Sequence, residues 1–591
     1  MIRTTADAFI GLEDPTPEEW ARWHAEMLEE RARLNVTYDD ATAWSDETFR
    51  QYFLFMYDAS FFANGRYRTA ELVAELRARF GRIDEIVLWH AYPRLGFDAR
   101  TQFDFYRDMP GGLARLRADV CDVLHALGVR VVVDYNPWDE GSLDDLAEIV
   151  FALDADAVML DTMTDVPSRL VDAVTAKKRG VVFMPELRMK IEELSLARQS
   201  WAQFCDMGEG PSIHKNRWLA PRHRQLVIAR WDTSRRRDVV SSFFEGSGLV
   251  IWENVFGSYN AYSREDRRLI TETGAVFDRY GDLFVRGTFL PLVPTGVKGL
   301  DANRFESGAR AITAFRNRTD RPLDFTAREP CFAFWMSREI HPGDVVTIAP
   351  HGTEALVVDD PSRARESLDH FDRVSHTADV DLPRVEAPRI VPPPRVTKSG
   401  TTSAKMIEIP GGPLHMRTTH QRRECGCWDH PWGSPHTEII THDVEVMLEP
   451  YAIRADLVTR AEFVAFVRAS GYRPTAPERF LLGEGSGPVT HVSLADARAF
   501  AAFEGHRLPT EAEWQRAGLA TPLWELTESE WTDGHTRFVM LRGGSPLPAT
   551  PSEWHAPRGP QPIESHAKYI RLADGLDRSA TISFRTVRPS S

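Results

Sequence analysis

The chain has 591 residues, of which 42% are hydrophobic and 27% charged, and its formal net charge is −15 at pH 7. Single hydrophobic cores stop growing at roughly 250–300 residues, so several domains are expected. The acidic balance argues against nucleic acid and anionic membranes as partners. No apolar run has the length of a signal peptide or a membrane span, and five cysteines predict no disulfide framework, so we expect a cytoplasmic protein.

Residues 1–50 are expected to form a helical extension, with a charged helix at Glu18–Arg33. From 51 to 285, short apolar runs alternate with segments whose apolar residues lie three and four apart. This pattern predicts an α/β domain, a (β/α)₈ TIM barrel. Its expected strands are Tyr52–Ala59, Glu85–His90, Arg130–Tyr135, Ala157–Thr162, Val181–Glu186, Ser200–Cys205, Gln225–Trp231 and Leu249–Asn254.

The pattern changes after residue 285. Short alternating runs between turn residues predict a small β-sandwich at 286–360. A polar, proline-rich stretch follows at 361–404, which we interpret as a semi-extended linker. The last domain occupies 405–591.

Acidic side chains follow the apolar runs of the barrel strands. Barrel enzymes carry their active sites at the carboxyl ends of the strands, and an unpaired buried carboxylate costs several kcal/mol, so these acids are expected to line a pocket. Two carboxyl groups with different pKa values are what glycoside hydrolysis needs, and aromatic rings at the same level can stack on sugars. We predict Asp161 and Glu186 as catalytic residues, and as substrate-binding residues Trp89, His90, Tyr92, Asp134, Asn136, Trp138, Arg188, Lys215, Arg230, Trp231 and Glu253.

The order of these acids resembles the α-amylase superfamily of barrel glycosidases. That superfamily has an Asp and an Asn after the third strand, an Asp nucleophile after the fourth and a Glu acid/base after the fifth. Asp134 with Asn136, Asp161 and Glu186 occupy the corresponding positions. Met159 stands where the superfamily has an Arg, and the α-galactosidase-like barrels are an equally good comparison.

The last domain resembles the formylglycine-generating (sulfatase-modifying factor) enzymes. The resemblance rests on the string Arg507–Trp514, RLPTEAEW, and on further motifs in family order from Met406-Ile-Glu-Ile-Pro-Gly-Gly to Ser583-Phe-Arg. It implies an α+β fold akin to C-type lectins. In the RLPTEAEW string, Thr510 and Glu513 have the spacing of a capping box at the start of a helix.

The family's oxidising chemistry is not expected here. Its enzymes use two cysteines after the Arg-Gly-Gly-Ser motif to bind copper, whereas this chain has no cysteine after Cys427. We therefore expect no metal and no cofactor.

Three hypotheses follow. The first is a retaining glycoside hydrolase whose partner is a carbohydrate substrate, with a non-oxidising C-terminal domain for structure or substrate recognition. The second is a carbohydrate-binding or scaffold protein with an inactive barrel. The third is a metal-dependent oxidoreductase or protein-modifying enzyme, which would need ligands such as Cys425 and Cys427. Homo-oligomers are compatible with each.

Overall fold

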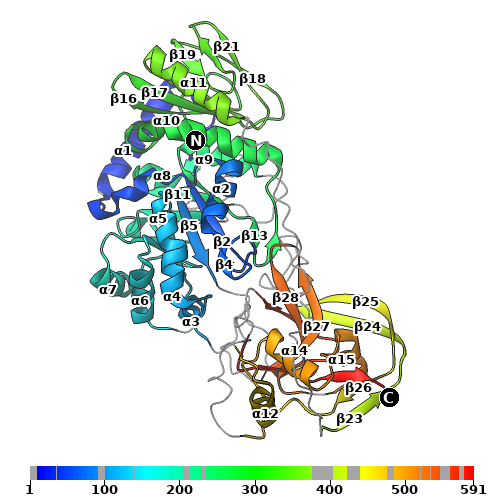
Figure 1. Ribbon diagram of the computed structural model, residues 1–591. Helices are drawn as coiled ribbons and strands as arrows, with labels where there is room; N and C mark the ends of the chain where they lie inside the picture. Colours follow the sequence, from blue (N-terminus) through cyan, green and yellow to red (C-terminus); the bar gives the residue numbers. More distant parts are fainter. Residues whose placement is uncertain are drawn as a thin grey trace.

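A computed structural model describes residues 9–34, 36–90, 97, 100–137, 141–187, 189–203, 212–228, 235–375, 404–421, 439–474, 485–519, 521–532, 534–545, 559–571 and 578–590. Figure 1 shows the barrel and the β-sandwich stacked on one side of the molecule, with the C-terminal domain beside the barrel. None of the helices in these ranges combines the length and apolar composition that crossing a bilayer requires.

The N-terminal part is the predicted (β/α)₈ barrel. Eight parallel strands follow the order β8-β7-β6-β5-β2-β12-β11-β9, so the sheet is closed except between β8 and β9, where no ladder joins the two strands. Each strand lies within or close to its predicted segment. The strands are β2 (Arg50–Phe55), β5 (Glu85–Trp89), β6 (Arg130–Tyr135), β7 (Ala157–Leu160), β8 (Val182–Pro185), β9 (Gln199–Gln203), β11 (Arg224–Ile228) and β12 (Gly248–Ile251).

Helices cover the outside of this barrel. The long helix α10 buries one whole face against the barrel and the sandwich, and α1 lies in the N-terminal extension, as expected. A π-helical turn, Arg117–Cys121, joins α4 and α5 into one continuous helical segment. The helices are α1 (Pro17–Leu34), α2 (Thr69–Phe80), α3 (Gln102–Arg107), α4 (Gly112–Leu116), α5 (Asp122–Ala126), α6 (Leu143–Leu153), α7 (Ser168–Lys177), α8 (Lys215–Leu219), α9 (Arg236–Glu245) and α10 (Arg264–Arg286).

Short strands decorate the barrel and form the sandwich. Three short ribbons, β1 with β10, β3 with β4, and β13 with β14, lie outside the main sheet. The sandwich packs a six-stranded sheet, β15-β16-β17-β22-β19-β20, on the pair β18-β21. The bounds are β1 (Phe9–Gly11), β10 (Ser212–His214), β3 (Phe62–Ala63), β4 (Arg66–Tyr67), β13 (Asn254–Val255), β14 (Ser258–Tyr259), β15 (Thr288–Leu290), β16 (Leu300–Ser307), β17 (Arg310–Asn317), β18 (Leu323–Thr326), β19 (Cys331–Ala333), β20 (Arg338–Ile340), β21 (Val345–Ile348) and β22 (Thr353–Val358).

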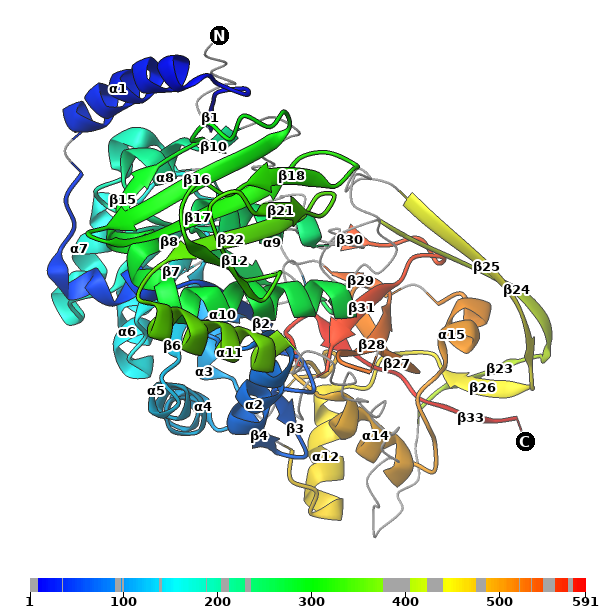
Figure 2. The same ribbon diagram turned by 90° about the horizontal axis from the view of Figure 1, so that it is seen from above.

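The prediction of a linker from residue 361 is wrong for its first part. Residues Pro361–Ser375 form the helix α11, which lies along α10 (Figure 2). Asp360 accepts hydrogen bonds from the first-turn amides of Ser362 and Arg363. Leu368 and Phe371 are buried on the barrel side, because apolar residues at helical spacing form a stripe that packs on α10. The proline-rich centre of the predicted linker lies outside the described residues.

The C-terminal domain is a mixed α/β structure built on two small sheets, β23-β26-β33 and β31-β28-β27-β32, and the long hairpin β24-β25. The capping box predicted for RLPTEAEW is present, because Thr510 Oγ1 accepts from Glu513 N and the Glu513 carboxylate accepts from Thr510 N. The elements are β23 (Met406–Ile409), β24 (Gly412–Gln421), β25 (Ile439–Leu448), β26 (Tyr451–Arg454), α12 (Arg460–Ser470), α14 (Leu494–Phe503), α15 (Glu511–Ala517), β27 (Trp524–Thr532), β28 (Arg537–Arg542), β29 (Gly544–Ser545), β30 (Gly559–Pro560), β31 (Ala567–Ile570), β32 (Ile582–Ser583) and β33 (Val587–Pro589).

Candidate active site at the barrel mouth

Asp161 and Glu186 lie at the ends of neighbouring strands. Asp161 follows β7 and Glu186 follows β8, and the two residues are 3% and 2% exposed. Glu186 Oε2 accepts a hydrogen bond of 2.6 Å from the amide of Thr162, the residue after Asp161. The structure therefore places the Glu186 carboxylate against the backbone of the residue that follows Asp161, at the barrel mouth.

The backbone next to Asp161 is strained. Thr162 has φ +57°, a conformation that β-branched residues rarely adopt. Such a residue costs of the order of 1–3 kcal/mol, and the cost is tolerated where surrounding contacts fix the conformation. Here the bond from the Thr162 amide to Glu186 and a bond from Thr162 Oγ1 to the Asp161 carbonyl hold it.

His90, Asp134 and Asn136 form the neighbouring part of the mouth. They follow or end β5 and β6, and all three are completely buried. His90 Nδ1 lies 3.8 Å from Asp134 Oδ2. The backbone of Asn136 is held on both sides by the side chain of Gln102, at 2.9 Å each. Predicted binding residues from two strands thus lie together.

Glu253 is bound in an ion pair inside the barrel wall. Its Oε1 lies 2.5 Å from Arg79 Nη1 and 3.0 Å from the hydroxyl of Tyr259, and its Oε2 accepts from Tyr52 at 3.3 Å. Burial disfavours the charge on Arg79, but the Glu253 carboxylate outweighs it and raises the pKa of the guanidinium. The pair fixes α2 to the segment after β12.

Two further predicted substrate contacts, Trp89 and Lys215, make contacts with other parts of the chain. Trp89 is completely buried, and its indole packs on Phe53, Trp252 and Phe256 with ring centroids 4.7–5.8 Å apart. It belongs to the aromatic core beneath the mouth, because four large rings fill the barrel at this level. Lys215 begins α8 before the amino end of β11, and its Nζ lies 3.0 Å from Glu30 on α1. Tyr92, Trp138, Arg188, Arg230 and Trp231 lie outside the described residues.

Asp58, which follows β2, is a buried acid of the mouth that was not among the predicted site residues. Asp58 is 2% exposed and accepts hydrogen bonds from Ser60, from Asn254 Nδ2 at 2.7 Å and from His535 Nδ1 at 3.2 Å. Burial alone would raise the pKa of this carboxyl. The hydrogen bond and charge of His535, together with the bonds from Asn254 and Ser60, lower it by more, so the pKa lies below its usual value. The sequence pattern that could have predicted Asp58 is an acid directly after the apolar run Phe53–Tyr57. The same pattern was the basis for predicting Asp161.

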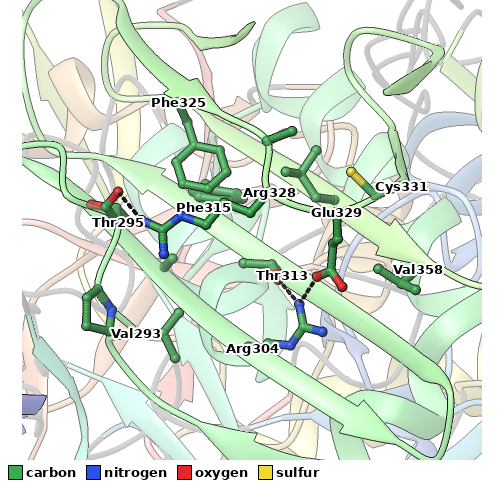
Figure 3. A pocket seen from close by; sticks show the side chains of 14 residues that line it. Val293, Thr295, Arg304, Thr313, Phe315, Phe325, Arg328, Glu329, Cys331 and Val358 are labelled. Atoms are coloured by element: carbon green, nitrogen blue, oxygen red, sulfur yellow. Dashed lines mark hydrogen bonds and ion pairs between the residues drawn. The ribbon is translucent and has the colours of Figure 1, made fainter. Parts of the chain in front are cut away.

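A separate cavity of ≈ 240 Å³ opens between the two sheets of the sandwich (Figure 3). Its floor is apolar, with Phe315 and Phe325 in ring contact. Its rim charges are paired, since Arg304 binds Glu329 at 2.6 Å and Arg328 donates to the Thr295 carbonyl. It brings no pair of carboxyl groups together, so the barrel mouth is the better candidate. In the described part of the chain, no group of three or more His, Cys, Asp or Glu is arranged to hold a metal; Cys425 and Cys427 lie outside it.

Comparison with solved structures finds barrel glycosidases. One is an α-amylase from Geobacillus thermoleovorans complexed with acarbose, 11% identical, with a TM-score of 0.39 over 54% of this chain and 99% of that one. Another is a GH27 β-L-arabinopyranosidase from Geobacillus stearothermophilus, 12% identical, with a TM-score of 0.36 over 54% of this chain and 99% of that one.

The C-terminal part has relatives in sequence. Residues 393–534 match the family model of the sulfatase-modifying factor enzyme 1-like domain. An inactive Cα-formylglycine-generating enzyme 2 from Bos taurus is 30% identical over 26% of this chain and 65% of its own length, and a formylglycine-generating enzyme from Streptomyces coelicolor is 29% identical over 20% and 51%. The chain thus spans between half and two thirds of these relatives. This protein therefore joins a (β/α)₈ barrel to a sulfatase-modifying factor enzyme 1-like domain.

Proposed function

We propose that this protein is a retaining glycoside hydrolase that works at the carboxyl end of the barrel. The observation that carries the proposal is the bond from the Thr162 amide to the Glu186 carboxylate, which ties Glu186 to the residue next to Asp161; both acids are buried and follow adjacent strands. Acids at the ends of neighbouring strands suit a double displacement, which needs a carboxyl separation of about 5–5.5 Å so that one carboxylate attacks the sugar directly.

The roles follow from strand position. Asp161 attacks the anomeric carbon, and Glu186 gives a proton to the leaving oxygen. Glu186 then takes a proton from the water that hydrolyses the glycosyl ester on Asp161. His90, Asp134 and Asn136 bind sugar hydroxyls beside the pair. The C-terminal domain takes no part in oxidation, because the two cysteines that its relatives' family uses have no counterpart after Cys427.

The test is a panel of nitrophenyl glycosides of both anomers, assayed with the full chain. Asp161→Ala and Glu186→Ala are expected to lower kcat on the best glycoside by about 10³-fold or more, because each removes a group that acts only in the transition state. Asp172→Asn is the matched control, since Asp172 is exposed on the outer helix α7.

Azide separates the two roles. With Glu186→Ala, azide should intercept the glycosyl-enzyme and give a glycosyl azide of retained configuration. With Asp161→Gly, azide enters from the vacated side and gives the inverted product. Full activity in either alanine variant, or a panel on which the wild type hydrolyses nothing, would overturn the proposal.

A further inference from the structure

The end of the β27-β28 hairpin lies against the mouth of the barrel. The carbonyl of His535 accepts a hydrogen bond of 2.7 Å from the amide of Ala59, after β2. Thr536 Oγ1 accepts from Asn254 Nδ2, after β12, at 2.9 Å. Phe538 and Trp531 pack with the barrel core, whereas Trp524, Leu526, Val539 and Leu541 of the hairpin pack inside the C-terminal domain. The hairpin thus joins the domain to two adjacent strand ends.

A third neighbouring strand end is also bound. Phe97, in the segment after β5, lies in the hydrophobic core of the C-terminal domain, and its carbonyl accepts from Ser579 and Thr581. Arg100 Nη2 donates to the Arg578 carbonyl at 2.6 Å. Because β5, β2 and β12 are consecutive in the barrel, the domain covers one continuous side of the mouth. The ends of β6, β7 and β8, which carry Asp134, Asp161 and Glu186, follow next in the same ring of strands.

The side chain of His535 contacts residues of two barrel segments, Asp58 after β2 and Tyr259 after β12. Its Nδ1 lies 3.2 Å from Asp58 Oδ1, and its ring is stacked on Tyr259 with centroids 3.4 Å apart and planes 8° apart. Tyr259 in turn donates to Glu253, the partner of Arg79. One histidine from the C-terminal domain therefore contacts both the segment after β2 and the segment after β12.

We propose that His535 is a positioning residue of the barrel's substrate site, and that the C-terminal domain forms a fixed wall of that site. The inference rests on the proposed function, and it assigns to the C-terminal domain a part in binding the sugar. His535 holds the Asp58 carboxylate by a hydrogen bond and Tyr259 by stacking, and so fixes the segments after β2 and β12 in one geometry. Sites need such support to within about 0.5 Å.

A positioning residue and a residue that only joins the two domains, here called a staple, differ in their effect on substrate binding. A staple would hold two domains together without altering substrate binding. A positioning residue changes KM, because disorder in the wall weakens sugar binding before it affects the chemistry at Asp161 and Glu186. The same substitution should therefore separate KM from kcat.

Three variants of the full chain test this. His535→Ala removes both the bond and the stacking. His535→Asn keeps a donor near the position of Nδ1 and should restore the bond to Asp58. His415→Ala is the control, because it breaks a His–Asp pair of 3.5 Å on the exposed β24-β25 hairpin of the same domain.

Two readouts are combined. Hydrogen exchange is measured in peptides covering 56–62 and 252–260, and kinetics are measured on the glycoside that the wild type hydrolyses best. For His535→Ala we expect faster exchange in both peptides and a KM raised about tenfold, with kcat within about threefold. His535→Asn should recover most of the KM, and His415→Ala should match the wild type.

The outcomes separate the two proposals. Unchanged hydrogen exchange in His535→Ala overturns the positioning role. Faster exchange with an unchanged KM also overturns it, because His535 would then only hold the two domains together. If the wild type hydrolyses no glycoside, the proposed function fails; faster exchange would then still support an ordering role of His535, and unchanged exchange would refute it.

Discussion

Glu354 on β22 is an acid in the core of the sandwich, and its raised pKa contributes to how stability depends on pH. Its Oε1 accepts from the amides of Trp335 at 3.0 Å and Ala355 at 2.8 Å. Burial nevertheless raises the pKa of this carboxyl from 4.5 to about 7. The folded pKa lies above the unfolded one, so the stabilisation is complete below about pH 4.5 and is lost as the pH rises to about 7. At ~1.4 kcal/mol per pKa unit the full loss is about 3 kcal/mol.

Glu354→Gln keeps an acceptor oxygen and removes the titration. Between pH 5 and pH 8 the wild type should therefore lose about 2.5 kcal/mol of unfolding free energy relative to this variant. Urea unfolding followed by tryptophan fluorescence measures the difference, because Trp335 sits beside Glu354 and packs on Phe243 and Phe371. Parallel pH curves for the two proteins would refute the assignment of a raised pKa to Glu354.

Three further substitutions have expected effects. Thr510→Ala removes the N-cap of α15 and should destabilise the C-terminal domain by about 0.5–2 kcal/mol in calorimetry; an unchanged Tm would contradict the role of the Thr510–Glu513 box. Arg79→Ala leaves Glu253 buried without its ion-pair partner, and should cost about 3–5 kcal/mol in urea unfolding, with a smaller cost when Glu253→Gln is added. Phe538→Ala should cost about 3–5 kcal/mol and speed proteolysis between the domains, whereas an unchanged digestion rate would show that this ring does not hold them together.

The barrel was predictable because its signal is local. Most of the strands contain a short run of buried apolar residues, and β6 begins and ends at the predicted residues. The helix α11 was missed because the composition of 361–404 as a whole is proline-rich. The apolar residues Ala364, Leu368 and Phe371 have helical spacing, and that local pattern determines the structure over Pro361–Ser375.

The candidate site was predictable only in its barrel half. Asp161, Glu186 and Asp134 stand directly after or at the end of apolar runs, where the cost of burying a charge singles them out. His535 has no such pattern around it. Its partner Asp58 lies 477 residues earlier in the chain, so only the docking of the two domains brings them together. A strand-end tryptophan such as Trp89 looks the same in sequence whether it lines a pocket or fills the core, so its packing on Phe53, Trp252 and Phe256 could not be predicted.

The position of Phe97 has a consequence for how the chain is made. Its ring packs on Trp524 and Tyr569, so a barrel residue completes the C-terminal core. The barrel leaves the ribosome first and must keep this aromatic side chain exposed until the last domain has been synthesised. A truncated chain that ends before residue 405 would expose the Phe97 ring to solvent. An isolated C-terminal fragment would lack this ring in its hydrophobic core, where Trp524 and Tyr569 contact it. We expect each half to be less soluble when expressed alone than within the full chain, because Phe97, Phe538 and Trp531 bury apolar surface between the two parts.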